Sequence, residues 1–112
     1  MIILTMASAM YLAGLQAAIT GPRIAFTNCL KKAEASAKTE KIAPDAYADY
    51  LRAACGTQGD RLKAALVAFD VKNGVSRTRA SNDASTDVTD GFTSSAQTYK
   101  YSASAASKAE AN

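Results

Sequence analysis

The hydrophobic positions of this chain recur every three or four residues in three stretches, the spacing that places side chains on one face of an α-helix. The first stretch follows Pro22, and its apolar positions are Phe26, Cys29, Leu30, Ala33 and Ala37. The pattern weakens just before Pro44, and a residue that precedes proline is disfavoured in a helix. We therefore predict a helix that begins at Pro22, a residue suited to a first helical turn, and ends in a turn near Ile42.

The second stretch begins at Pro44 and Asp45, which supply a preset first turn and a negative charge at the positive end of a helix. Its apolar face consists of Tyr47, Leu51, Cys55, Leu62, Leu66 and Phe69. Gly56 and Gly59 interrupt this face, and each costs up to about 1 kcal/mol relative to alanine inside a helix. We expect a kink or a short break there. The helix should end at Asn73-Gly74, where glycine suits a left-handed cap.

The third stretch opens with Val75 and Ser76, which fit the roles of a hydrophobic staple residue and a helix N-cap. Its apolar positions recur about every four residues, at Ala80, Ala84, Val88, Phe92, Ala96 and Tyr99. Residues 102–112 contain almost only Ala, Ser, Lys and Glu. This composition buries too little apolar area to repay the entropy of ordering, so we expect a helical domain over residues 21–101 and a flexible tail over 102–112.

The two cysteines lie symmetrically about the predicted turn. Cys29 and Cys55 each stand thirteen residues from Ile42, so each sulfur lies roughly 20 Å along its helix from the turn. Both belong to apolar faces, which favours a disulfide over two buried free thiols, and the Cys-x-x-Cys spacing of a redox-active pair is missing. A bridge that closes about 26 residues contributes on the order of 3 kcal/mol. The fold class predicted is all-α: a disulfide-clamped antiparallel helical hairpin with a third helix, forming a small three-helix bundle.

An apolar segment precedes this bundle. Residues 1–20 carry no charged side chain, and Met1 to Leu15 has the character of the apolar heart of a signal peptide, with cleavage after Ala17, Ala18 or Thr20. Two alternatives remain, an uncleaved membrane anchor and a buried core helix. If the segment is kept as a membrane anchor, the residues after it are expected on the cytoplasmic side. Disulfides persist in oxidising compartments, so the cysteines favour export. We expect a periplasmic or secreted protein, with a membrane-anchored protein as the alternative.

The sequence has few of the residue types and motifs that catalysis or metal binding requires. The 112 residues include no histidine, which removes the commonest general base and the commonest transition-metal ligand. No glycine-rich phosphate loop or Ser-x-x-Lys motif occurs. Asp83, Asp87 and Asp90 share one helical stripe, which we interpret as a solvated face rather than a Ca²⁺ site. We therefore expect a protein that is not an enzyme and has no catalytic residues, metal or cofactor.

Positive charge is concentrated in the first two thirds of the chain. The net charge is +3, and residues 23–79 hold eleven basic and six acidic side chains. Lys72, Arg77 and Arg79 gather where the second helix ends and the third begins, and they form a possible anion-binding corner. Tyr47, Tyr50, Tyr99 and Tyr101 are not interleaved with basic residues as in single-strand binders, so we expect no nucleic-acid partner.

The sequence alone does not determine the function. In size and composition the chain is similar to the small helical proteins with one disulfide found in bacterial envelopes, a likeness of general character that assigns no residue a role. Our leading hypothesis is a small non-enzymatic exported protein that acts as an interaction module or chaperone-like factor, with another envelope protein as partner. The alternative is a membrane-anchored accessory subunit, in which only the N-terminal segment contacts the membrane.

Overall fold

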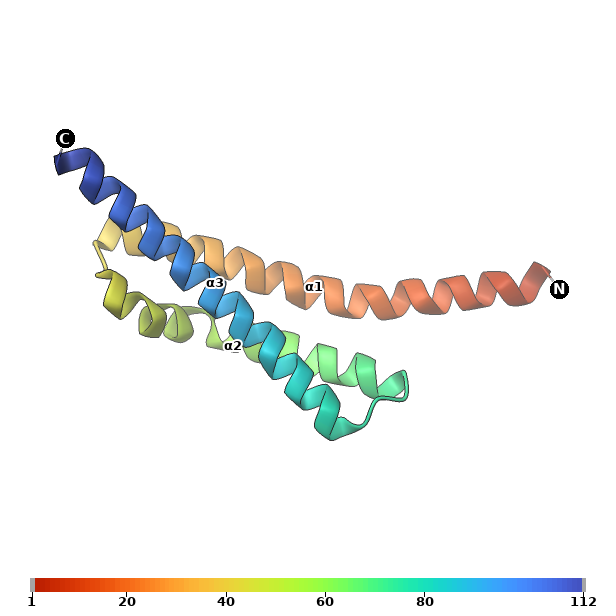
Figure 1. Ribbon diagram of the computed structural model, residues 1–112. Coiled ribbons are helices and arrows are strands. Elements are labelled where there is room, and N and C mark those ends of the chain that lie inside the picture. Colours follow the sequence, from red (N-terminus) through yellow and green to blue (C-terminus); the bar gives the residue numbers. More distant parts are fainter. Residues whose placement is uncertain (1, 112) are drawn as a thin grey trace.

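The computed structural model of the protein consists of three long helices joined by two short turns (Figure 1). The helices are α1 (Ile2–Glu40), α2 (Pro44–Lys72) and α3 (Arg77–Ala111). The structure describes the backbone of residues 2–111 and the side chains of residues 18–106, and no strand occurs in this part of the chain. α2 packs along both other helices, whereas α1 and α3 touch each other at few points. The predicted all-α class with three helices is confirmed.

The turn between α1 and α2 lies where the hydrophobic pattern places it. The Ile42 N–H donates to the Ala37 carbonyl at 2.9 Å, and the Lys41 N–H donates to the Lys38 carbonyl at 3.3 Å. These two bonds form the Schellman pattern that ends many helices, and it requires a left-handed residue after the last helical one. That residue is Lys41, with a φ of 57°. Pro44 then opens α2 in its first turn.

The turn between α2 and α3 repeats this pattern with glycine in the left-handed position. Gly74 has a φ of 89°, and the Val75 N–H donates to the Asp70 carbonyl at 2.9 Å. Ser76 Oγ accepts a hydrogen bond from the Arg79 N–H at 3.3 Å, as an N-cap does. The predicted glycine cap and the predicted serine N-cap are both confirmed.

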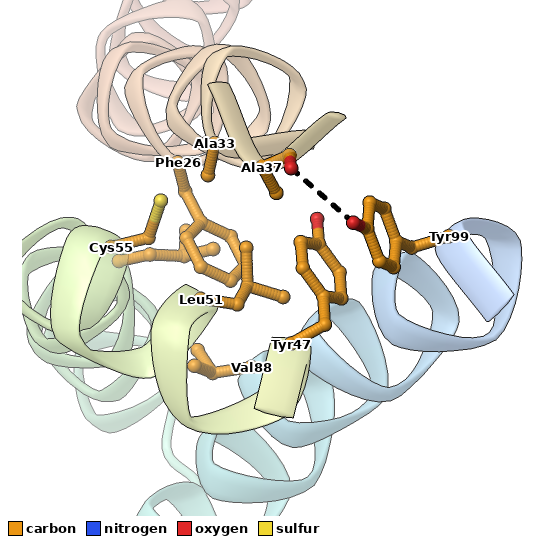
Figure 2. Packing of buried hydrophobic residues seen from close by; sticks show 9 residues of the cluster. Phe26, Ala33, Ala37, Tyr47, Leu51, Cys55, Val88 and Tyr99 are labelled. Carbon is orange, nitrogen blue, oxygen red and sulfur yellow. Dashed lines mark hydrogen bonds between the residues drawn. The ribbon is translucent and has the colours of Figure 1, made fainter. Parts of the chain in front are cut away.

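The core lies along α2, between α1 and α3. Residues from all three predicted apolar faces point into it (Figure 2), although Phe69 of the second face does not belong to the core cluster. The fully or nearly fully buried side chains include Phe26, Ala33, Ala37, Tyr47, Leu51, Cys55, Leu62, Ala80, Ala84, Val88 and Tyr99. Cys29, Leu30, Leu66, Phe92 and Ala96 are partly buried and pack against this cluster. The largest fully buried side chains, Tyr47, Leu51, Leu62 and Cys55, all come from α2.

The sequence predicts a kink or a short break at Gly56 and Gly59. The break is wrong, because α2 continues without interruption from Pro44 to Lys72, and the kink stays a prediction. Gly59 is buried, and a Cβ atom at this position would lie 3.2 Å from Cγ1 of Val88 and 3.3 Å from Cε2 of Phe92. The missing side chain lets α3 approach α2 closely. This packing offsets the intrinsic cost of glycine in a helix.

The two ends of the chain extend past the three-helix core in opposite directions (Figure 1). α1 begins at Ile2 and contains Pro22 in its interior, so the predicted helix start at Pro22 is wrong for the chain as it stands. The expected leader or anchor, residues 1–20, lies for the most part outside the residues whose side chains are described. α3 includes the expected tail up to Ala111, and the flexibility of residues 102–112 stays a prediction.

Candidate functional site

A disulfide joins α1 to α2 at the position that the cysteine spacing predicts. Cys29 and Cys55 form an S–S bond with their Cα atoms 5.8 Å apart, so the predicted clamp is confirmed. Cys55 is completely buried. Cys29 is partly exposed and borders an open groove of about 440 Å³ between α1 and α2, together with Lys32, Ser36 and Tyr50. The bridge is therefore a core contact with one edge near solvent.

A pair of stacked tyrosines packs against the turn that joins α1 and α2. The rings of Tyr47 and Tyr99 lie 4.0 Å apart with an interplanar angle of 15°. The Tyr99 hydroxyl donates to the carbonyl of Ile42, and it also lies 3.4 Å from the carbonyl of Ala37, the contact drawn in Figure 2. α3 thereby caps the turn between α1 and α2. These two tyrosines serve the core and offer no aromatic binding surface.

Burial changes the titration of Tyr47. Its hydroxyl lies 3.1 Å from Oγ of Ser95, and its side chain is completely buried. Removal from water disfavours the phenolate, so burial raises the pKa of Tyr47 above its ordinary value, and the hydrogen bond with Ser95 opposes this effect. Tyr101, in contrast, is 80% exposed on the extension of α3.

Two acids of the stripe on α3, Asp83 and Asp87, form ion pairs with arginines. Asp87 binds Arg23 of α1 at 2.9 Å, and Asp83 lies 3.8 Å from Arg79 one helical turn earlier. The hydrogen bond from Arg23 to Asp87 raises the pKa of the arginine. Within residues 18–106, no group of three or more acids or cysteines is arranged to hold a metal ion. Asp87 thus forms one of the contacts that join α3 to α1.

A groove with several charged side chains follows the outer side of the second half of α2. Its floor consists of Ala64, Val67, Ala68 and Val71, which recur at i, i+3, i+4 and i+7 and so form one helical stripe. The groove is open and has a volume of about 630 Å³. The charged side chains around this floor are Asp60, Lys63, Lys72 and Arg77. We call these eight residues the α2 outer groove.

The structure brings together two of the three residues predicted to form an anion-binding corner. Lys72 and Arg77 line the α2 outer groove, whereas Arg79 lies outside it, beside Asp83. The third cation of the groove is Lys63, which the sequence reasoning missed. The available signal was a second apolar stripe on α2, Ala64 to Val71, flanked by Lys63 and Lys72. Anion binding by these residues stays a prediction.

The three cations of this groove are not neutralised by the fold. Within the described part of the chain, the ion pairs are Arg23 with Asp87, Lys38 with Glu34, and Arg79 with Asp83. None of them involves Lys63, Lys72 or Arg77, and Asp60 is the one acid among the groove residues. The groove therefore presents a positive rim around an apolar floor.

No protein-family profile, curated protein or solved structure matches this chain. Among the described residues, no helix combines the length and the apolar character needed to cross a membrane. The function of the candidate site is therefore inferred from the arrangement of its own residues.

Proposed function

We propose that this chain is a small non-enzymatic protein exported to the periplasm or the cell exterior, where it acts as an interaction module. The disulfide between Cys29 and Cys55 carries the proposal. Such bonds persist in oxidising compartments and are rare where thiols are kept reduced. The lack of histidine and of any catalytic motif in the sequence supports the non-enzymatic part. The uncompensated cations of the α2 outer groove support a role in binding, with another envelope protein as partner.

The position of Pro22 adds support for removal of the leader. In the full chain Pro22 lies inside α1, where it lacks the N–H that would bond to the carbonyl of Ala18 and so weakens the helix. Cleavage after Ala18 or Thr20 removes the Ala18 carbonyl and leaves Pro22 within the first turn of the shortened helix, whereas cleavage after Ala17 would keep that carbonyl. Proline costs nothing there, because the N–H groups of a first turn have no helical partner.

The alternative is a membrane-anchored accessory subunit with an intact N-terminus. The continuity of α1 from Ile2 to Glu40 favours it, since a retained segment would extend a helix of the bundle without a joint. Mass spectrometry of the purified mature chain separates the two proposals. A first residue between Ala18 and Gly21 supports cleaved export, and an intact Met1 in the membrane fraction supports the anchor.

Thiol trapping in intact producing cells tests the compartment. Rapid acid quenching followed by a maleimide reagent of high mass should leave the native chain unmodified and should modify both cysteines after reduction. The matched control is Leu12→Arg, which places a charge in the apolar run and blocks its use as a leader. Its cysteines should be trapped as free thiols. Free Cys29 and Cys55 in the wild-type chain would contradict export.

A further inference from the structure

The second half of α2 is apolar on two opposite sides. Leu62 belongs to the core and Leu66 packs against it, while the floor of the α2 outer groove lies on the opposite side of the helix. A helix that packs on one side is normally polar on the other, and the outer side of the first half of α2 follows this rule with Asp45 and Asp49 exposed. Among residues 18–106 no helix covers this side, and an uncovered apolar side is typical of an interaction surface.

The floor of the groove is shaped for another helix. Its side chains are small, alanine and valine, and small side chains allow two helix axes to approach closely. The stripe from Ala64 to Val71 extends over two helical turns, about 10 Å of helix axis. Val67 and Val71 are partly buried already, and Ala64 and Ala68 are exposed. A helix with small or medium apolar side chains would cover this stripe.

The rim determines the charge of the helix that fits. Lys63 and Lys72 flank opposite edges of the stripe, and Arg77 follows from the start of α3. Three cations face one acid, Asp60, so an acidic partner is favoured by charge complementarity. We infer that the α2 outer groove docks an acidic amphipathic helix of a partner protein. This inference rests on the proposed function as an interaction module and gives the chemistry of the partner.

Two other occupants fit the groove less well. A second copy of this chain in a symmetric contact would bring Lys63, Lys72 and Arg77 against the same cations, which repel. An anionic bilayer would satisfy the cations, but alanine and valine bury little apolar area in it, and Asp60 at the groove would face the lipid phosphates. An acidic helix can place one basic side chain opposite Asp60, which a uniformly anionic surface cannot do.

The binding test uses the purified, oxidised full chain and a labelled synthetic peptide. The probe is a helical peptide with an alanine–leucine stripe flanked by glutamates, and its twin carries lysines in place of the glutamates. Fluorescence anisotropy should show saturable binding of the acidic peptide, weakened by added salt. The lysine twin should not bind. Because the chain is purified, this result is independent of the compartment, so failure here and failure of the thiol-trapping experiment are distinguishable.

Charge reversal locates the binding surface. The double variant Lys72→Glu/Arg77→Glu should weaken binding of the acidic peptide by about tenfold or more, because it replaces attraction with repulsion at two rim positions. The matched control, Lys31→Glu/Lys100→Glu, changes the net charge equally at exposed positions outside the groove and should leave affinity unchanged. Val67→Lys places a charge in the floor and should also abolish binding. Circular dichroism verifies that all three variants retain wild-type helicity.

Four results would overturn the inference. The first is no binding of the acidic peptide, and the second is equal loss of affinity in the groove variant and the control variant, which would indicate a response to net charge alone. The third is co-sedimentation with phosphatidylglycerol vesicles that depends on Lys72 and Arg77 while the peptide does not bind, which would assign the groove to lipid. The fourth is a concentration-dependent dimer that Val67→Lys converts to monomer.

Discussion

Two glycines inside helices should respond differently to substitution by alanine, one with a gain in stability and the other with none or a loss. A Cβ atom at Gly56 of α2 would meet no atom within 4 Å, whereas a Cβ atom at Gly91 of α3 would lie 2.8 Å from Cε1 of Phe26. Carbon atoms in contact normally stand about 3.5–4.0 Å apart. Phe26 is only 4% exposed, and its ring packs edge-on against Phe92 with the centroids 5.1 Å apart. The ring therefore has little room to move.

The magnitudes follow from two opposing effects. Alanine is more favourable than glycine in a helix by about 1 kcal/mol, so Gly56→Ala should raise the free energy of unfolding by about this amount. Gly91→Ala has the same helix-propensity gain of about 1 kcal/mol, but it overpacks the contact with Phe26, which costs about 1–3 kcal/mol. Its net effect should lie between no change and a loss of about 2 kcal/mol. The two variants should thus differ by about 1–3 kcal/mol.

Urea unfolding of the oxidised chain, followed by far-ultraviolet circular dichroism, measures this difference. Phe26→Leu removes the ring atoms that a new Cβ would meet, so Gly91→Ala should become stabilising in the Phe26→Leu background. That rescue distinguishes a steric contact from a general intolerance of α3 to substitution. If Gly91→Ala stabilises the wild-type chain as much as Gly56→Ala does, α1 and α3 do not approach each other at Phe26, and the reasoning is refuted.

Three further predictions concern the clamp, the first turn and the core. Cys29→Ala/Cys55→Ala should lower the free energy of unfolding by about 3.5 kcal/mol in oxidising buffer, because the bridge closes 26 residues of the unfolded chain; identical thermal melts of the wild type with and without reductant would contradict this. Lys41→Gly should raise the urea midpoint, because glycine removes the strain of a left-handed backbone at this position, about 1–2 kcal/mol. The greater freedom of glycine in the unfolded chain offsets about 0.5–1 kcal/mol of this gain. Lys41→Ala should give no gain. Burial raises the pKa of Tyr47 in the folded state above its ordinary value of 10.0, so the stability linked to its protonation is intact below pH 10 and is lost as pH rises through the raised pKa. Tyr47→Phe should show a shallower fall in the urea midpoint over that alkaline range, and an equal fall in both proteins would refute the assignment.

The amino-acid sequence by itself determined the three helical segments and the two turns that join them. The three- and four-residue spacing of apolar positions predicts which side of each helix is buried, because that spacing is a property of helix geometry. Pro44, Gly74 and Ser76 mark helix ends through local effects: a fixed φ, freedom at positive φ, and a side-chain acceptor for a free N–H. The disulfide was predictable for the same reason, since equal distances from a turn place Cys29 and Cys55 at equal heights on antiparallel helices.

The tertiary structure decided what depends on the distance between helices. Local propensity predicts a break at Gly59, but the close approach of Val88 and Phe92 stabilises a continuous α2 there. The sequence grouped Arg79 with Lys72 and Arg77 because they are neighbours along the chain. The direction in which α3 begins instead places Arg77 in the same groove as Lys63 and leaves Arg79 with Asp83. The spacing of apolar residues determines which side of each helix is buried, whereas the packing of one helix on another determines which charged side chains lie on the same surface.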